Sequence, residues 1–181
     1  MEVEEAIRSY RSCTQFQPTP LPPEKLKTVL AAARYSPSQR NLQPWRFVVV
    51  RDDERKRLLA QACTRRKVVG EAPAIIVAFA VEEDIPITIS GYISAYPLDV
   101  AVAIHSLQLA AESEGLGTNW MIDFNDEKVR SVVGAPEGVH PIAVIPIGFP
   151  QQANGGVVSR EDADVGRKSP DEIIAYDTYP W

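Results

Sequence analysis

The sequence is poor in the residues that most often make metal sites and disulfide scaffolds. Its 181 residues include two cysteines, Cys13 and Cys63, and two histidines, His105 and His140. Two cysteines are too few for a disulfide framework, and neither lies in a pattern typical of a nucleophile, so we expect ordinary small side chains in a reducing cytoplasm. We also expect no metal site. We expect His105 to be a hydrogen-bonded core residue and His140 to be structural.

Other absences narrow the classes of function. No apolar run approaches the ~18 residues that a membrane-spanning helix needs, and the net charge of −5 argues against nucleic acid as the main partner. The acidic start at residues 1–5 is unlike the basic start of a signal peptide. Neither a Ser-His-Asp set nor a catalytic pair of carboxylates is visible. Gly115-Leu116-Gly117 lacks the third glycine of a dinucleotide-binding fingerprint, so we expect it to end a helix.

What is present is typical of one globular domain, residues 1–181. Hydrophobic residues make up 45% of the chain and charged residues 24%, which suits a single core. The apolar spacing predicts helices over Val3–Ser9, Pro23–Tyr35, Asp52–Ala62 and Asp99–Ser113, and a short helix that Asn125 or Asp126 caps and that ends at Val133. Continuous apolar runs predict strands over Phe47–Val50, Ile75–Phe79 and Ile142–Phe149. One helix then joins the first two strands, and the order of elements favours the α+β class.

Two segments point to an oligomer. The predicted helix Asp99–Ser113 is apolar nearly all round, which is typical of a central helix or a subunit interface. Residues 151–166 are polar and contain glycine, so we expect a flexible excursion. Residues 167–181 turn apolar and aromatic again, and we expect this tail to pack on something, such as a second subunit.

The most informative stretch is the polar loop Ser36–Trp45, which lies between a predicted helix and a predicted strand. Its hydroxyl and amide side chains suit a flat, neutral ligand rich in heteroatoms better than a metal or a phosphate. The alternative is a loop whose side chains only satisfy their own backbone through Asx and Ser turns.

The string Pro37-Ser38-x-x-Asn41-x-Gln43-Pro44-Trp45 resembles the signature of the FMN-dependent nitroreductase family. Further segments resemble that family in the same order, from residue 7 to residue 176. They include Arg11-Ser12 with Phe16, Ala72 to Val77, Leu109 to Trp120, Pro136 to Pro150 and Arg167 to Ile173. Because several motifs match in order, the resemblance is much more specific than any one of them.

The resemblance implies an α-β-α sandwich with a central mixed, mainly antiparallel sheet, and a homodimer with non-covalent FMN at its interface. It implies that Arg11, Ser12 and Arg167 bind the phosphate and that Pro37, Ser38, Gln39 and Asn41 embrace the ring from the neighbouring subunit. It places Arg65 at the pyrimidine edge and Met121, Ile122 and Asp123 beside N5 and O4.

The chain departs from the family at three of these places. Tyr10 and Thr14 stand where basic residues are common, which removes charge from the phosphate site. Asp123 stands where many members have a small residue, and it could relay a proton or instead cap the following helix. Arg65 could equally belong to an exposed charged turn over residues 65–67.

The implied activity is transfer of a hydride from NADH or NADPH through flavin N5 to a nitroaromatic, quinone or similar acceptor. The cofactor carries this chemistry, so no catalytic side chain is implied. The alternatives are a relative with other flavin chemistry, such as a reductive dehalogenase or a flavin-fragmenting enzyme, and a flavin-binding protein without turnover. The lid position at residues 82–95 is short, which favours an open site.

Overall fold

The computed structural model describes residues 1–81, 88–89, 93–151 and 166–179. Helices run over α1 (Val3–Ser9), α2 (Pro23–Arg34), α3 (Asp53–Ala62), α4 (Arg66–Glu71), α5 (Tyr96–Ser113) and α6 (Asp126–Val133), with 3₁₀ turns η1 (Gln39–Asn41) and η2 (Pro170–Glu172). Strands run over β1 (Trp45–Val50), β2 (Ala74–Val81), β3 (Thr88–Ile89), β4 (Ile93–Ser94), β5 (Gly117–Thr118) and β6 (Val139–Gly148). Among these elements, no helix is long and apolar enough to cross a bilayer.

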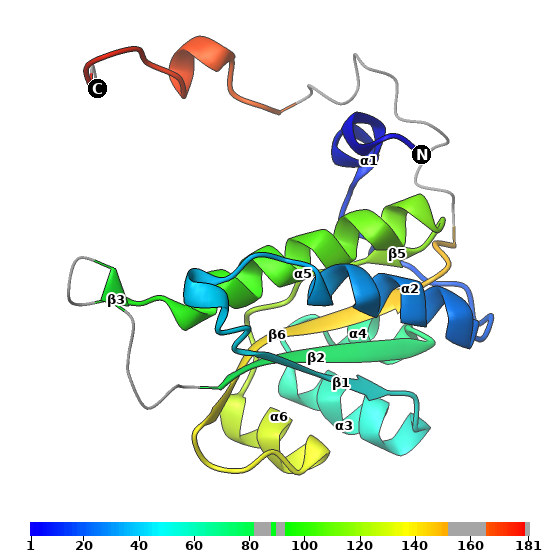
Figure 1. Cartoon of the computed structure of the whole chain (residues 1–181). Helices are drawn as coiled ribbons and strands as arrows, with labels where there is room; N and C mark the ends of the chain where they lie inside the picture. The colour runs from blue at the N-terminus through cyan, green and yellow to red at the C-terminus, as the bar shows by residue number, and fades with distance from the viewer. Residues whose placement is uncertain (82–87, 90–92, 152–165, 180–181) are drawn as a thin grey trace.

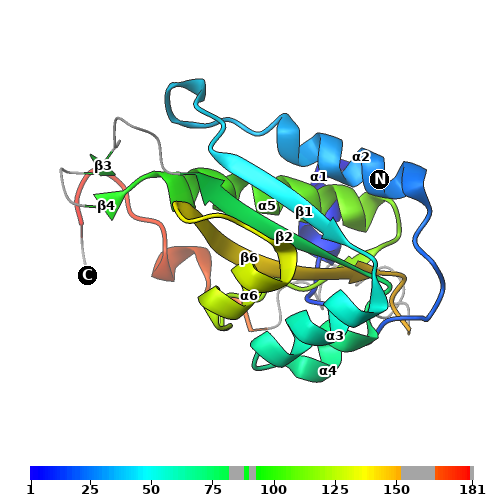
Figure 2. The same cartoon turned by 90° about the horizontal axis from the view of Figure 1, so that it is seen from below.

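A four-stranded sheet in the order β1-β2-β6-β5 forms the middle layer. Helices α2 and α5 cover one of its faces, and α3, α4 and α6 cover the other (Figures 1 and 2). The expected α+β class with helices on both faces is therefore confirmed. The expected mixture of strand directions is not seen in the described sheet, because each of its strand pairs is antiparallel.

The two faces of β2 explain how the layers differ. Residues Ala74, Ile76, Ala78 and Ala80 belong to the core cluster under α2 and α5. The alternate residues Ile75, Val77 and Phe79 belong to the cluster under α3, α4 and α6. Successive side chains of a strand point to opposite faces. The small alanines let α5 lie close to the sheet, and the larger side chains fill the space on the other face.

Most predicted elements are confirmed, with shifted ends. Helix α5 starts at Tyr96 rather than Asp99, because Pro97 suits a first helical turn and extends the helix towards the N-terminus. It ends where Gly115 takes the left-handed φ of 72°, as we expected for a helix end. Asn125 is the cap of α6, since its Oδ1 accepts from the amide of Lys128 at 2.9 Å. The capping role considered for Asp123 is therefore wrong.

Two expectations are corrected. Two helices, α3 and α4, join β1 to β2 instead of one. Arg65, Arg66 and Lys67 are all exposed, as the alternative interpretation expected; Arg65 lies in the bend before α4 and the next two residues begin that helix. His105 is exposed on α5 rather than part of the core. His140 lies within β6 and stacks on Tyr96 with ring centroids 5.9 Å apart, which fits its expected structural role.

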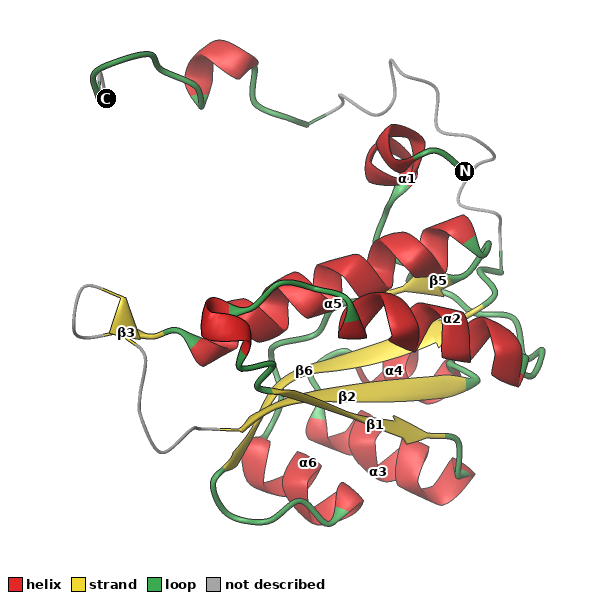
Figure 3. Ribbon diagram, viewed as in Figure 1, coloured by secondary structure: helices red, strands yellow, loops and turns green. Residues whose placement is uncertain are grey.

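The C-terminal segment leaves the body of the chain. Residues 166–179 are exposed, and the ribbon leads them away beyond α1 (Figure 3). Ile173 is 59% exposed and Tyr176 is 84% exposed. Residues 152–165, most of the expected excursion, lie outside the described residues, as does most of the expected lid segment 82–95. The described part of the lid segment consists of β3, β4 and Ala95, the residue before α5.

Candidate functional site

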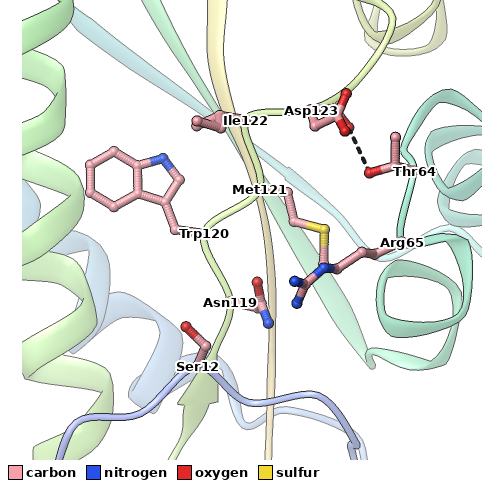
Figure 4. A pocket seen from close by; sticks show the side chains of 8 residues that line it. All are labelled: Ser12, Thr64, Arg65, Asn119, Trp120, Met121, Ile122 and Asp123. Carbon is pink, nitrogen blue, oxygen red and sulfur yellow. Dashed lines mark hydrogen bonds between the residues drawn. The ribbon is translucent and has the colours of Figure 1, made fainter. Parts of the chain in front are cut away.

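A cavity of about 320 Å³ opens where the segment after β5 passes the turn between α3 and α4. It is lined by Ser12, Thr64, Arg65, Asn119, Trp120, Met121, Ile122 and Asp123. Figure 4 shows Trp120 and Arg65 on opposite sides of the extended segment 119–123. The volume of the cavity is within the range of small-molecule sites, about 300–1,000 Å³.

Hydrogen bonds to strand β6 fix this segment on its inner side. The amide of Asn119 donates to Pro146 O at 3.2 Å, and the amide of Met121 donates to Val144 O at 3.1 Å. The Met121 side chain is buried in the core between the sheet and α3. The segment is therefore an irregular extension of the sheet edge with a rigid backbone.

The next two residues line the cavity and carry backbone donors. Within the described residues, the amides of Ile122 and Asp123 have no hydrogen-bond partner. Ile122 is 73% exposed, and Asp123 is also exposed. Backbone N–H groups need a partner from solvent or from a ligand. Two successive free donors on a rigid segment can therefore bind an acceptor edge of a flat molecule.

The far wall of the cavity is held to this segment by Thr64. Its amide and its hydroxyl both donate to the carbonyl oxygen of Asp123, at 3.2 and 3.4 Å (Figure 4). Cys63 forms an isolated antiparallel bridge with Phe124. These contacts bring Arg65, the residue before α4, to the cavity. The guanidinium of Arg65 gives the cavity a positive charge.

Ser12 reaches the cavity because its segment pairs with β5. Ser12 forms a parallel bridge with Thr118. The amide of Cys13 donates to Thr118 O at 2.8 Å, and Nδ2 of Asn119 donates back to Cys13 O at 2.8 Å. Asn119 is 3% exposed, so its amide is committed to this bond. The hydroxyl of Ser12 is thus carried by a segment fixed on both sides.

The side chains of Tyr10 and Arg11, which precede Ser12, lie outside the cavity. Nη1 of Arg11 donates to the carbonyl oxygens of Arg8 and Tyr10, both at 2.8 Å, so its guanidinium turns towards the end of α1. The hydroxyl of Tyr10 accepts from Nε2 of Gln108, which is buried in α5. Burial raises the pKa of Tyr10 above its usual value. Neither Arg11 nor Tyr10 lines the cavity.

The structure thus brings together five of the residues expected at a flavin site and leaves six apart. Those together are Ser12, Arg65, Met121, Ile122 and Asp123. Those outside the cavity are Arg11, Pro37, Ser38, Gln39, Asn41 and Arg167. The loop 37–43 lies at the start of α5, where the amide of Gln39 donates to Asp99, whereas β5 follows the end of that helix (Figure 1). Arg167 is exposed in the C-terminal segment.

Sequence reasoning missed Thr64, Asn119 and Trp120. Thr64 and Asn119 act through bonds to residues 59 and 106 positions away, which no local pattern reveals. Trp120 directly precedes residues 121–123, which the resemblance assigned to the flavin ring. Its position in the sequence was therefore a signal that its indole could also lie at the ring. Its Nε1 is buried and has no hydrogen-bond partner among the described residues.

Comparison with known proteins identifies the family of the chain. The sequence profile of the Nitroreductase family matches residues 7–67 and 60–149. The chain belongs to the nitroreductase family. An NADH dehydrogenase of Thermus thermophilus is 30% identical over 181 residues, covering 84% of this chain and 88% of that protein.

Solved nitroreductase structures agree with the fold. A nitroreductase family protein of Clostridium difficile 630 superposes with a TM-score of 0.86 at 26% identity, and the match covers 99% of this chain and 100% of that one. An FMN-dependent nitroreductase of Clostridium difficile R20291 gives a TM-score of 0.73 at 26% identity, over 82% and 88% of the two chains. The nitroreductase-like sandwich is confirmed, and the chain is an oxidoreductase of this flavoprotein family.

Proposed function

We propose that this nitroreductase family member binds FMN in the cavity after β5 and uses NADH or NADPH to reduce a nitroaromatic, a quinone or a similar small acceptor. When bound, FMN supplies the hydride chemistry itself, and the protein supplies a slot, orientation and electrostatics. The observation that carries the proposal is that Ile122 and Asp123, whose amides have no partner among the described residues, line a cavity that Arg65 also lines.

The donors present in the cavity fit the edges of a flavin ring. The amides of Ile122 and Asp123 would donate to N5 and O4, which are acceptors along one side of the ring. The guanidinium of Arg65 would lie at the pyrimidine edge, where a cation stabilises negative charge. The hydroxyl of Ser12 would donate to the phosphate. Arg11 and Arg167 would join it after the side chain of Arg11 leaves its backbone acceptors.

The site is completed, in this proposal, by a second copy of the chain. The loop residues Pro37, Ser38, Gln39 and Asn41 would cover the ring of the neighbouring subunit, because they lie away from their own cavity. Leu98 and Val102 are 53% and 44% exposed on α5, which supports this helix as the interface. The exposed apolar tail would embrace the partner.

The test is the visible absorption spectrum of the purified protein after incubation with FMN and removal of free ligand. We expect retained flavin near one per subunit, bleached by NADH or NADPH without oxygen. Retained flavin that neither nicotinamide bleaches would overturn the reductase activity and leave a binding protein. Absence of retained flavin would overturn the proposal as a whole.

The variant Arg65→Gln tests whether the positive charge of Arg65 sets the reduction potential of the flavin without being needed to bind it. We expect it to retain FMN but to lower the flavin reduction potential, because the cation favours the reduced, more negative ring. Arg66→Gln is the matched control, since Arg66 is a neighbouring exposed arginine that does not line the cavity. Equal potentials in the two variants would contradict the role of Arg65.

A further inference from the structure

The loop between α2 and β1 has a strained backbone that the rest of the chain must hold in place. Arg40, Asn41 and Gln43 have φ values of 50°, 57° and 50°. Left-handed φ values are unfavourable for residues other than glycine, and asparagine tolerates them better than arginine or glutamine. Each such residue costs on the order of 1 kcal/mol, so a loop with three of them needs compensating contacts.

One compensating contact comes from outside the loop. Both carboxylate oxygens of Asp99 accept from the amide of Gln39, at 3.1 and 3.2 Å. Asp99 lies in the first turn of α5, 60 residues further along the chain. The carboxylate also suits that position because helix N-termini favour negative charge. Asp99 therefore fixes the entrance of the strained stretch to the rigid long helix.

The remaining contacts lie within the loop or just before it. Ser38 Oγ accepts from the amide of Gln43 at 2.9 Å, which closes the loop across its base. Ser36 Oγ donates to Ser106 Oγ of α5 at 2.8 Å. The loop side chains themselves are largely exposed, Pro37, Gln39 and Asn41 among them. The geometry thus fixes the backbone and leaves these side chains available to a partner surface.

We propose that Asp99 is a positioning residue that holds the Pro37–Gln43 loop in its binding conformation before the loop meets the flavin site of a second subunit. The inference rests on the proposed function and adds to it a residue outside the expected flavin contacts. Without the carboxylate, the strained φ values relax and the competent loop becomes a minority state. The apparent affinity for FMN then falls by the fraction of loops that remain competent.

The experiment compares Asp99→Leu with Asp99→Asn. Both variants remove the negative charge at the start of α5, but asparagine keeps an oxygen that accepts from Gln39 and leucine does not. We expect FMN to bind about tenfold or more weakly to Asp99→Leu and within about threefold of the wild type to Asp99→Asn. Asp99→Ala serves as a second deletion variant if leucine prevents folding, which circular dichroism of the flavin-free protein reports.

Trypsin provides a readout that does not depend on flavin. Arg40 is exposed and lies in the strained stretch, so cleavage after it reports how often the loop opens. We expect the flavin-free Asp99→Leu protein to be cut after Arg40 several-fold faster than the wild type and the asparagine variant, by mass spectrometry. Equal cleavage rates and equal FMN affinities in all three proteins would overturn the role of Asp99.

The outcomes separate this inference from the proposed function. A wild type that binds FMN, with a leucine variant that binds it equally well, overturns only the positioning role. A wild type that binds no FMN overturns the proposed function, and the positioning role falls with it. Weakened FMN binding by both Asp99 variants would point to charge rather than to the hydrogen bond, and would also overturn the positioning role.

Discussion

At Gly117 two segments of the chain lie so close that no side chain fits between them. A Cβ built on Gly117 would stand 2.6 Å from Cβ of Cys13, which is buried. The substitution Gly117→Ala must therefore push away the segment that carries Ser12. We expect a loss of stability of about 1–3 kcal/mol, typical of overpacking, together with weaker FMN retention.

Gly70→Ala is the matched control for this prediction. Its added Cβ would meet Cβ of Ala60 at 3.6 Å, an ordinary contact, and alanine favours the helix α4. Urea unfolding and the FMN content after gel filtration measure both variants. An alanine at Gly117 as stable and as flavin-rich as the control would contradict the close packing of the Ser12 segment against β5.

The thiol of Cys63 makes stability depend on pH in the alkaline range. Burial raises its pKa from a usual value near 9 to about 11, and the charge of Asp123 adds to this. Below pH 9 the thiol is protonated in both folded and unfolded chains. As the pH rises towards 11, only the unfolded chain loses the proton, so stability falls by on the order of 2 kcal/mol.

The variant Cys63→Ala lacks this titration and isolates it from other groups. We expect the free energy of unfolding of the wild type to decrease more steeply than that of the variant between pH 8 and pH 10.5, as measured by urea titration. Parallel pH profiles would show that the Cys63 thiol titrates alike in both states.

At the scale of elements, the sequence predicts the helices and strands whose apolar pattern matches their burial in the fold. The buried strand β2 has eight residues, seven of them fully buried, and its continuous apolar run identifies it. Helix α4 escapes prediction because it has six residues and one buried side chain, Val69. Strand β5 has two residues and exists because residues 117–118 pair with β6. Such short elements depend on tertiary contacts that no local spacing records.

Helix α6 allows its cap to be separated from the cavity beside it. Asn125 caps the helix, whereas Asp123 lines the cavity. We expect Asn125→Ala to lower the free energy of unfolding by about 1 kcal/mol, because an N-cap side chain is lost. We expect Asp123→Ala to change it by less than about 0.5 kcal/mol, as for an exposed side chain. Thermal unfolding of the flavin-free proteins checks both, and a reversed order would assign the cap to Asp123.

At the scale of the whole molecule, the order of the family motifs along the chain decides which residues of the site can be predicted from the sequence. Ser12, Arg65 and residues 121–123 could be assigned because the family keeps these motifs in one order, although they meet only in the folded chain. Asn119 could not, because its role is a buried bond to Cys13. The position of the loop 37–43 relative to the cavity is likewise a property of the fold, set by the length of α5 between them.

The C-terminal tail gives the last prediction, because several of its apolar side chains are exposed. Ile173 and Ile174 are 59% and 51% exposed, and Tyr176 is 84% exposed. If the tail embraces a partner, removal of residues 176–181 takes buried aromatic contacts from the dimer. Aromatic anchors of an interface contribute about 2 kcal/mol or more, so the dimer dissociation constant should rise at least about tenfold.

Sedimentation measures the dimer, and absorbance at the flavin band measures bound FMN in the same samples. Because the proposed site needs the loop of the second subunit, we expect flavin content to fall together with the dimer. Asp171→Asn, an exposed polar change in the same tail, is the control and should alter neither quantity. A shortened protein that stays dimeric and fully loaded with flavin would show that the tail has no part in assembly, and the exposed face of α5 would then have to hold the two subunits together without it.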